Sequence, residues 1–364
     1  MLLTGASIFA CLAFPAPSIL VTDGLAKSAL TLLESSGATV VEKHCSLPEL
    51  IERLPAFDAV IIRSATSLEA SAIDAGSAGR LRVLGRAGVG VDNIDLDAAR
   101  ANHCWVLNTP GASTQSVVEL TLAHMLAAAR GLQDADQGLK TGSWLKGQLR
   151  LGAQGGPRVG HELAGKALGI LGFGRIAQSL ATTASALGMS VHAFSPNADP
   201  QRADALGVTL VPTEADLFAK CTHVVVMCAL NERTRGLVCR RRIALMPQRG
   251  MDGTYCGSHL FNMARGGIVV EADVAKALQA GSLNTYATDV FEQEPPPTDH
   301  PLLISPNFHG TPHVGAATLE AQARVGIQIA TNVLAALEYS HDSTSLLPEG
   351  IVCQGRISPK AKPL

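Results

Sequence analysis

The sequence predicts an α/β protein built from two doubly wound domains, each with a parallel sheet. Short apolar runs alternate with amphipathic stretches from residue 18 onward, which is typical of repeated strand–helix–strand units. The alternation starts again after a long apolar stretch at 116–132, so the pattern indicates two separate sheets. A chain of 364 residues, 47% of them hydrophobic, is long enough to bury two cores of ordinary size.

The first domain begins with a strand–helix–strand unit and continues with three further strands. SILVTD at 18–23 and ATVVEK at 38–43 flank a helical stretch at 25–37. The further strand candidates, each ending in small or polar residues, are FDAVIIRSA, LRVLGRAG and WVLNTPGA. Ligands of open parallel sheets bind at the carboxyl ends of the strands, so the loops after these strands are candidate binding loops.

The second domain follows a long buried helix predicted at 116–132, which Ser113, Thr114 and Gln115 precede as a polar start signal. The strand candidates of this domain are KALGILG, SVHAFS, THVVVMCA, SHLFNMA and TYATDVF. A final helix predicted at 318–337 returns the chain to the first domain.

These elements predict the domain boundaries. We expect one domain at 18–112 plus 314–345 and the other at 113–313, with an N-terminal extension at 1–17 and a C-terminal tail at 346–364.

Three stretches do not follow the alternation. Residues 145–160 are rich in glycine with scattered basic residues, and residues 251–257 are also rich in turn formers, so both are predicted to be exposed loops. PPPTDHP at 295–301 predicts a stiff surface connection.

The charge and the cysteines exclude several classes of protein. A net charge of -2 provides no concentrated basic face for nucleic acid or an anionic membrane, so a small-molecule ligand is expected. The eight cysteines include no C-x-x-C pair, which argues against a zinc knuckle or a disulfide framework and favours reduced thiols in a cytoplasmic protein. The apolar start MLLTGASIFACLAF lacks basic residues and is too short to span a bilayer, so we interpret it as an extension, with a targeting segment as the alternative.

The stretch ILGFGRIAQS at 170–179 has the residues of a cradle for a dinucleotide phosphate. An apolar strand runs into Gly172, Gly174 and Ala177, and a helical pattern follows. The first glycine permits a tight turn, the second lets backbone N–H groups approach a pyrophosphate, and the small third residue packs helix against strand. A structural turn is the alternative, but strand, loop, helix and next strand occur in the order that a nucleotide site requires.

The next strand ends at Ser195, where an acidic residue would bind the ribose hydroxyls and repel a 2′-phosphate. Serine carries no charge and cannot repel that phosphate. Arg202 lies nearby in the sequence as a possible phosphate partner. We therefore expect NAD as cofactor, with NADP also accepted.

Arg265, Glu294 and His313 together supply the groups that a hydride transfer from a secondary alcohol requires. A histidine can accept the hydroxyl proton near neutral pH, and a carboxylate on its other nitrogen fixes the tautomer. A guanidinium can hold a substrate carboxylate at two points. Each residue alone also has another interpretation: a surface salt bridge, a solvated loop charge and a helix cap, respectively. Metal binding by His309 and His313 is not expected, because Pro312 argues against a helix there, and we expect no metal site.

Six motifs resemble the D-isomer-specific 2-hydroxyacid dehydrogenase family and occur in that family's order between about residue 18 and about residue 340. They are GRAGVGVDNIDLDAA, NTPGASTQSVVEL, LGILGFGRIA, NMARGGIVVEADVAKAL, ATDVFEQEPP and TPHVGAATLEAQARVG. The resemblance implies a flavodoxin-like substrate domain and a Rossmann cofactor domain with a cleft between them. IIRSAT, GRAGVGVDN and ATLEAQ are most similar to members that oxidise D-3-phosphoglycerate to 3-phosphohydroxypyruvate, the first step of serine biosynthesis.

The resemblance also implies roles for individual residues. Arg265 would bind the substrate, Glu294 and His313 would form the proton-transfer pair, and Asp289 would hold the nicotinamide carboxamide. The implied substrate-binding positions are Arg63, Ser64, Val89, Gly90 and Ser113. The implied cofactor-binding positions are Gly172, Gly174, Arg175, Ile176, Ser195, Cys228, Met263, Ala264, Asp289, Gly315 and Ala316.

Several positions depart from the family pattern. Ser195 replaces the aspartate that binds the ribose, which puts the preference for NAD in doubt. The fourth strand of the cofactor domain ends in MCAL at 227–230 instead of H-x-P-L, so the loop over the adenine loses its proline. Ser113 stands where a hinge asparagine is common.

The expected activity is the NAD(P)-dependent oxidation of D-3-phosphoglycerate. A glyoxylate or hydroxypyruvate reductase is the alternative, since the same three residues would serve it equally well. A dinucleotide-sensing, corepressor-like binding protein is a further alternative from another class. The resemblance also implies a homodimer formed through the cofactor domains. Because only about twenty residues follow the catalytic part, we expect no regulatory amino-acid-binding domain and no inhibition by L-serine.

Overall fold

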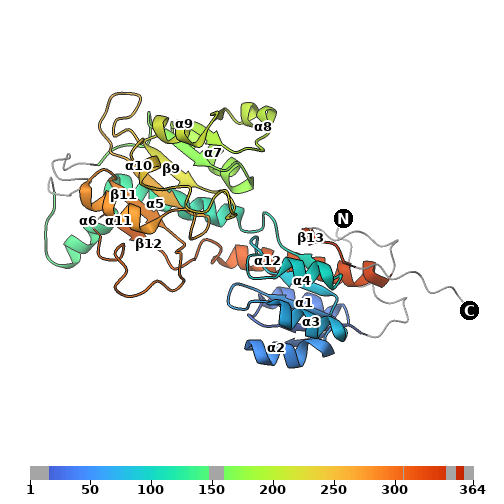
Figure 1. The fold of residues 1–364 in the computed structure, drawn as a ribbon. Coiled ribbons are helices and arrows are strands. Elements are labelled where there is room, and N and C mark those ends of the chain that lie inside the picture. The colour runs from blue at the N-terminus through green and yellow to red at the C-terminus, as the bar shows by residue number, and fades with distance from the viewer. Residues whose placement is uncertain (1–15, 147–159, 306, 342–349, 356–364) are drawn as a thin grey trace, which may run out of the picture. The chain divides into compact units, whose positions relative to one another are not determined.

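The computed structural model describes residues 16–146, 160–305, 307–341 and 350–355 (Figure 1). The chain forms two compact units: the described residues up to Ser113 together with those from Ala317 onward, and Thr114–Ala316. The sequence analysis placed these boundaries at 112/113 and 313/314. All but the last two residues of the expected extension at 1–17, and most of the expected loop at 145–160, lie outside the described residues.

A six-stranded sheet forms the centre of the first unit. Its strands are β1 (Ser18–Val21), β2 (Thr39–Glu42), β3 (Ala59–Ile62), β4 (Val83–Arg86), β5 (Trp105–Leu107) and β13 (Ile351–Cys353). The order is β13-β5-β4-β3-β1-β2, in which β13 runs antiparallel to β5 and all other neighbours are parallel. Apart from β13 this is the flavodoxin-like order that was predicted. β13 lies in the expected C-terminal tail, where no strand was predicted.

Helices cover both faces of this sheet. One face packs against α1 (Lys27–Ser35) and α12 (Leu319–His341), and the other against α2 (Leu47–Arg53), α3 (Ala70–Ala78) and α4 (Leu96–Ala101), with a 3-10 turn η1 (Leu54–Ala56). The helix α12 lies close to β4, because a methyl group on Gly85 would come within 2.7 Å of Val333. Glycine at this position therefore lets the final helix approach the sheet.

The second unit contains a seven-stranded sheet in which every pair of neighbours is parallel. Its strands are β6 (Ala167–Leu171), β7 (Ser190–Phe194), β8 (Thr209–Leu210), β9 (His223–Val226), β10 (His259–Asn262), β11 (Thr285–Thr288) and β12 (Phe308–Gly310). The strand order is β12-β11-β10-β9-β6-β7-β8. The chain adds β7 and β8 on one side of β6 and then returns to add β9 to β12 on the other side, so the order of addition reverses between β6 and β9. This is the Rossmann order with one added strand, and its ligands bind at the reversal, outside the carboxyl ends of the strands.

Two layers of helices cover the second sheet. One layer contains α5 (Thr114–Arg130), α7 (Arg175–Ala186) and α8 (Pro200–Ala205), and the other contains α9 (Glu214–Lys220), α10 (Arg240–Ile243) and α11 (Glu271–Ala280). The helix predicted at 116–132 is α5, and Gly131 in the left-handed region (φ 58°) separates it from α6 (Leu132–Lys140). Both units are thus doubly wound α/β sheets, as predicted.

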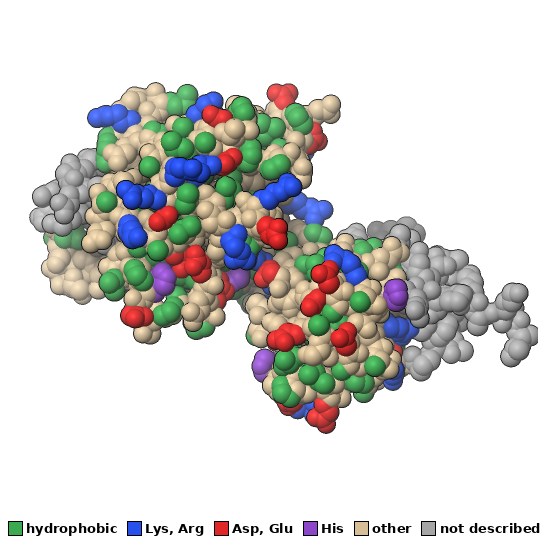
Figure 2. Space-filling model, in the orientation of Figure 1, with side chains coloured by type: hydrophobic (Ala, Val, Ile, Leu, Met, Phe, Trp, Pro, Cys, Tyr) green, Lys and Arg blue, Asp and Glu red, His purple; other side chains and the backbone are tan. Residues whose placement is uncertain are grey.

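Some local expectations need correction. The short strands β8 and β12 were not predicted. The loop expected to be exposed at 251–257 is exposed at 251–254, but Cys256 and Gly257 are buried, and Asp252 forms a 2.8 Å ion pair with the buried Lys166. Among the described residues, no helix combines the length and the apolar character that a membrane crossing needs. On the face shown in Figure 2, acidic and basic side chains are interspersed on both units, in keeping with the net charge of -2.

Candidate active site

Strand β6 runs directly into a glycine turn that leads to α7. Gly172 has a φ of 110°, and a methyl group there would lie 2.7 Å from the carbonyl oxygen of Met227, so only glycine fits. Gly174 immediately precedes α7, and apart from its chain neighbours no described residue has an atom within 4 Å of the place that a methyl group on it would take. Ala177, 1% exposed, packs α7 onto the sheet. Open space therefore borders a helix N-terminus, the geometry that receives a pyrophosphate.

Ser195 follows β7, next to the glycine turn. The N–H of Gly172 donates to the carbonyl oxygen of Phe194 at 2.8 Å, which joins the two segments. Arg202 on α8 donates from Nε to Oε1 of Gln178 on α7 at 3.1 Å. The guanidinium of Arg202 therefore lies beside α7, the helix that follows the glycine turn. Ser195 lacks the negative charge that would repel a 2′-phosphate.

The turn after β10 holds Arg265. Asn262, the last residue of β10 and 1% exposed, accepts the N–H of Ala264 at 3.2 Å and donates to the carbonyl oxygen of Arg265 at 3.0 Å. A methyl group on Gly266 would lie only 1.8 Å from the carbonyl oxygen of Phe291. The amide of Asn262 thus holds the turn at Arg265. The lack of a side chain at Gly266 lets this turn lie against Phe291, in the segment that leads to Glu294.

Glu294 and His313 form a hydrogen-bonded pair in the segments that follow β11 and β12. Nδ1 of His313 lies 2.7 Å from Oε2 of Glu294, and Oε1 of Glu294 accepts the N–H of Phe291 at 3.1 Å. His313 has a φ of 53°, a left-handed conformation that is rare outside glycine and often found at functional sites. Because Nδ1 donates to the carboxylate, Nε2 carries the lone pair and can act as a base.

The electrostatics of Glu294 favour its ionised form. Burial opposes ionisation, but hydrogen bonds from His313 and from the N–H of Phe291, with the positive charges of His313 and Arg265, outweigh it and lower the pKa of Glu294. Arg265 is therefore close enough to act on the carboxylate of the pair. The three residues that the sequence analysis selected from separate motifs lie together.

Asp289 organises the segment that carries His313. Its Oδ1 accepts the hydroxyl of Thr311 at 2.7 Å and the N–H of Val314 at 2.8 Å, and its Oδ2 accepts the N–H of Gly315 at 2.7 Å. Nε2 of His124 on α5 lies 3.2 Å from the Thr311 oxygen, and burial lowers the pKa of His124. A buried carboxylate with these three donors holds both ends of the turn at His313.

A cavity of about 410 Å³ borders the Glu294–His313 pair. Its other walls are mostly apolar and come from Phe291, Pro295, Pro296, Leu303, Phe308, Gly310, Thr311 and Pro312.

Comparison with known proteins agrees with this geometry. Residues 122–315 match the family described as D-isomer specific 2-hydroxyacid dehydrogenase, NAD binding domain. The chain is 38% identical over 316 residues to a hydroxypyruvate reductase of Thermotoga maritima, covering 86% of this chain and 96% of that protein. The chain belongs to the D-isomer-specific 2-hydroxyacid dehydrogenase family.

Other members of the family are similar over the same region. A D-3-phosphoglycerate dehydrogenase of Methanocaldococcus jannaschii is 38% identical over 315 residues, which are 86% of this chain and 56% of that protein. The chain thus spans about half the length of the curated phosphoglycerate dehydrogenases that it matches. The TT0316 protein of Thermus thermophilus superposes with a TM-score of 0.78 at 30% identity, covering 92% of this chain and 99% of that one.

The remaining expected cofactor residues of this dehydrogenase domain border the same edge of the sheet. Arg175 and Ile176 begin α7. Met263 and Ala264 follow β10, and Gly315 and Ala316 follow the turn at His313. Cys228 follows β9, where burial raises the pKa of its thiol to about 11, so it is protonated at neutral pH.

The expected substrate residues lie in the first unit, after its strands. Arg63 and Ser64 follow β3, where the N–H of Arg63 donates to Asp23 at 2.7 Å. Val89 and Gly90 follow β4, and Val89 is 42% exposed. Buried Ser113, the fifth of these residues, is the last residue before α5.

Sequence reasoning missed the residues that position the site. Asn262 and Thr311 lie within the motifs, but nothing in their spacing predicts that their side chains bind the backbone of the Arg265 turn or the carboxylate of Asp289. The sequence predicts His124 only as part of a buried helix. A polar residue at the end of a buried strand is the one signal that could have identified Asn262.

Proposed function

We propose that this chain catalyses the NAD(P)-dependent oxidation of D-3-phosphoglycerate to 3-phosphohydroxypyruvate. The observation that carries the proposal is the 2.7 Å contact between His313 and Glu294, beside Arg265, in the NAD binding domain of a dehydrogenase family. The substrate is supported by the names of relatives, among them the D-3-phosphoglycerate dehydrogenases of Methanocaldococcus jannaschii and Archaeoglobus fulgidus, each 38% identical to this chain.

In this mechanism Nε2 of His313 accepts the proton of the substrate hydroxyl. Glu294 fixes the tautomer and stabilises the imidazolium that forms. The guanidinium of Arg265 binds the substrate carboxylate and polarises the neighbouring oxygen. The glycine turn leaves room for the pyrophosphate of NAD. When bound, NAD would supply the nicotinamide that accepts the hydride. The reverse reaction requires His313 to donate the same proton.

We assign substrate binding to the first unit, with described residues at 18–112 and beyond 316, and cofactor binding to the second. Arg63 and Ser64 would line the substrate site, and the backbone of Val89 and Gly90 would donate to the substrate carboxylate. The positions of all four after parallel strands support this assignment, because ligands of such sheets bind there.

Hydroxypyruvate or glyoxylate reduction is the second candidate. It is favoured by the relative that this chain covers almost completely, which is named a hydroxypyruvate reductase. A glyoxylate reductase of Paecilomyes thermophila also superposes with a TM-score of 0.78 at 25% identity, over 93% of this chain and 99% of that one. Steady-state kinetics on 3-phosphoglycerate, hydroxypyruvate and glyoxylate separate the candidates. A higher kcat/KM for an unphosphorylated acid would reject the first.

Ser195 and the nearby Arg202 support use of both cofactors, with NAD favoured modestly. Rates with NAD and NADP, measured side by side on 3-phosphoglycerate, test this. Discrimination above about a hundredfold, roughly 2.7 kcal/mol, would show that position 195 does not decide the choice.

The proposal includes a homodimer and a reducing compartment such as the cytoplasm. Apolar side chains on and after α5 and α6 support the dimer, since Leu132, Leu139 and Trp144 are 53%, 60% and 74% exposed. Light scattering that gives the mass of one chain would reject it. Free thiols at every described cysteine support the compartment.

A further inference from the structure

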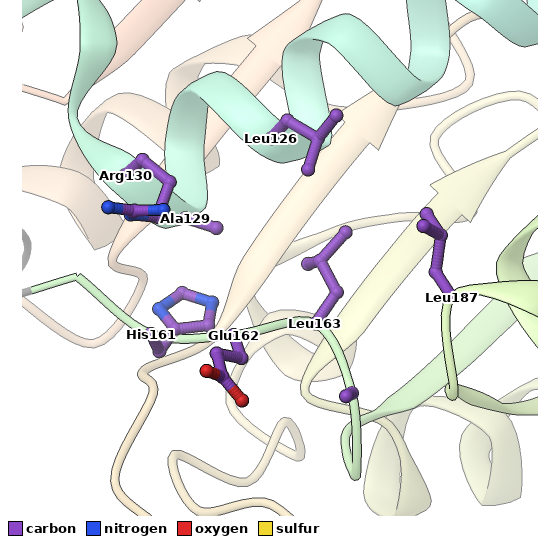
Figure 3. A pocket seen from close by; sticks show the side chains of 8 residues that line it. Leu126, Ala129, Arg130, His161, Glu162, Leu163 and Leu187 are labelled. Carbon is purple, nitrogen blue, oxygen red and sulfur yellow. The ribbon is translucent and has the colours of Figure 1, made fainter.

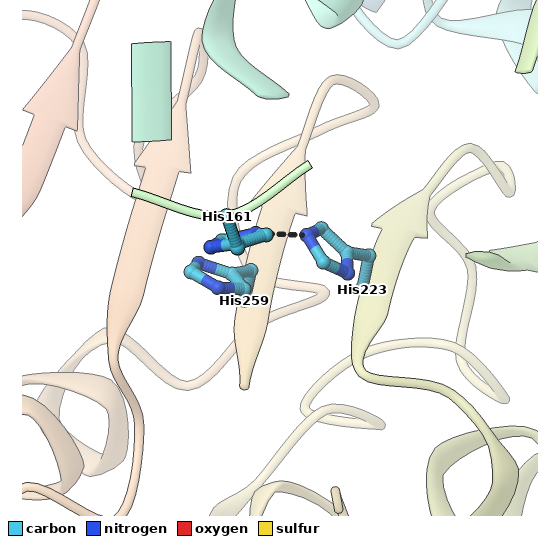
Figure 4. A group of neighbouring side chains, drawn as sticks. All are labelled: His161, His223 and His259. Carbon is cyan, nitrogen blue, oxygen red and sulfur yellow. Dashed lines mark hydrogen bonds between the residues drawn. The ribbon is translucent and has the colours of Figure 1, made fainter. Parts of the chain in front are cut away.

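Three histidines meet at the amino-terminal edge of the second sheet, the edge opposite the glycine turn (Figure 4). His223 and His259 are the first residues of the neighbouring strands β9 and β10 and are paired in register. His161 lies in the segment before β6, where its N–H donates to the carbonyl oxygen of Ala129 at the end of α5 at 3.0 Å. The sequence analysis, which expected no metal, did not consider these residues.

The ring nitrogens of this histidine cluster have the spacing of metal ligands. Nε2 of His161 and Nε2 of His223 share a hydrogen bond at 3.2 Å, whose proton a bound ion would replace, and each of the three rings offers one nitrogen within 4.8 Å of the others. Two nitrogens bound to one tetrahedral zinc ion, each at about 2.0–2.1 Å, are about 3.3 Å apart. Binding an ion therefore requires a movement of the third nitrogen of only about 1.5 Å or less.

Hydrogen bonds outside the cluster orient two of the rings as ligands. The hydroxyl of Thr222 donates to the carbonyl oxygen of Ala167 at 3.4 Å, so its oxygen accepts Nδ1–H of His223 at 3.0 Å and leaves the lone pair on Nε2. Nε2–H of His259 donates to the carbonyl oxygen of Cys256 at 2.8 Å. Histidine ligands usually donate their second N–H in this way.

One nitrogen of the cluster is buried without a partner. His259 is 1% exposed, and its Nδ1 makes no hydrogen bond to any described residue. Burying such an acceptor unpaired is costly, so each case calls for an explanation. An ion bound at Nδ1 would supply the missing partner.

The cluster is buried in the second unit. His223 is 0% exposed and His259 is 1% exposed, and burial disfavours the charged form of an imidazole. Neutral imidazoles have the lone pairs that a metal requires.

A cavity of about 260 Å³ borders His161 of the cluster (Figure 3). It is lined by His161 and Glu162, by Arg130 and other residues of α5, and by Leu163 and Leu187. A water molecule or a small donor in this cavity could complete the coordination on the side of His161.

We propose that His161, His223 and His259 bind one divalent transition-metal ion of the zinc class, at a structural site remote from the Glu294–His313 pair. Imidazole ligands suit zinc, copper and nickel better than magnesium or calcium. The site would tie the segment at 160–166 to the strands β9 and β10. This inference does not rest on the proposed dehydrogenase activity.

The test uses the full chain, stripped with a chelator and then dialysed against Zn²⁺ alone. We expect about one Zn²⁺ per chain by elemental analysis, a raised melting temperature, and visible absorption of tetrahedral coordination when Co²⁺ replaces Zn²⁺. Absence of bound ion in the wild-type chain would overturn the proposal and leave the cluster as a stack of neutral rings.

Variants locate the site. His161→Ala, in a segment outside the strands, should weaken Zn²⁺ binding at least tenfold and remove the Co²⁺ absorption. Thr222→Val, which removes the acceptor of His223, should weaken binding about tenfold to a hundredfold. His192→Ala is the matched control, because His192 on β7 is also partly buried and lies outside the cluster. Binding by His161→Ala equal to that of the wild type would contradict the assignment.

Discussion

Replacing Glu294 by glutamine tests the role of the carboxylate in the pair. Glutamine keeps an oxygen that can accept the N–H of Phe291, now 3.1 Å from Oε1, so the local fold should survive. The substitution removes the negative charge 2.7 Å from Nδ1 of His313. It also introduces an amide that can present its NH₂ group to Nδ1 and favour the wrong tautomer.

The structure sets the size of the expected effect. Two unit charges about 4 Å apart interact by about 4 kcal/mol at an effective dielectric of 20 and by about 1 kcal/mol in water. Both side chains are 38% exposed, so the stabilisation of the imidazolium lies between these limits. Glu294→Gln should therefore lower kcat by about fivefold to nearly a thousandfold, with a central value near a hundredfold.

The assay is steady-state kinetics in both directions, with 3-phosphoglycerate and NAD and with 3-phosphohydroxypyruvate and NADH. The affinity for NAD, followed by fluorescence, should stay within about twofold of the wild-type value. The glycine turn that borders the cofactor lies between β6 and α7, away from Glu294 in the sequence. Glu292→Gln is the matched control, since Glu292 is exposed and two residues away. A kcat of Glu294→Gln within twofold of the wild type would refute the proton relay.

Further predictions concern the cofactor, the fold and pH. Ser195→Asp should raise the ratio of kcat/KM for NAD over NADP at least tenfold, measured with both cofactors. Gly174→Ala should keep the melting temperature but weaken NAD binding, measured by titration, because its methyl group enters the open space of the cradle. Gly266→Ala should lower the free energy of unfolding by about 2–5 kcal/mol in urea, because its methyl group would lie 1.8 Å from a backbone oxygen. The lowered pKa values of His161 and His259 mean that the unfolded chain binds more protons below about pH 6.5. The free energy of unfolding should therefore fall as pH decreases from about 6.5 to 4, by roughly 1.4 kcal/mol per pH unit for each such histidine; a flat profile would contradict the burial of these rings.

The fold class could be read from local patterns, and the candidate catalytic residues from their chemistry together with the family resemblance. The run ALGIL followed by Gly172, Gly174 and Ala177 predicts strand, turn and helix, because each step depends on residues adjacent in the chain. Arg265, Glu294 and His313 were selected because their side chains have the required chemistry. Their distances could not be read in the same way, since they depend on how β10, β11 and β12 lie beside one another.

The sequence by itself determined the alternation of strands and helices, the glycine cradle and the types of group available for proton transfer, because these depend on periodicity and on short-range chemistry. Tertiary structure alone decided that Asn262 holds the Arg265 turn, that Asp289 holds the turn at His313, and that β13 closes one edge of the first sheet. It also brought His161 against His223, which are 62 residues apart. Such contacts join side chains that are remote along the chain, and the order of parallel strands, which local patterns do not encode, determines which of them meet.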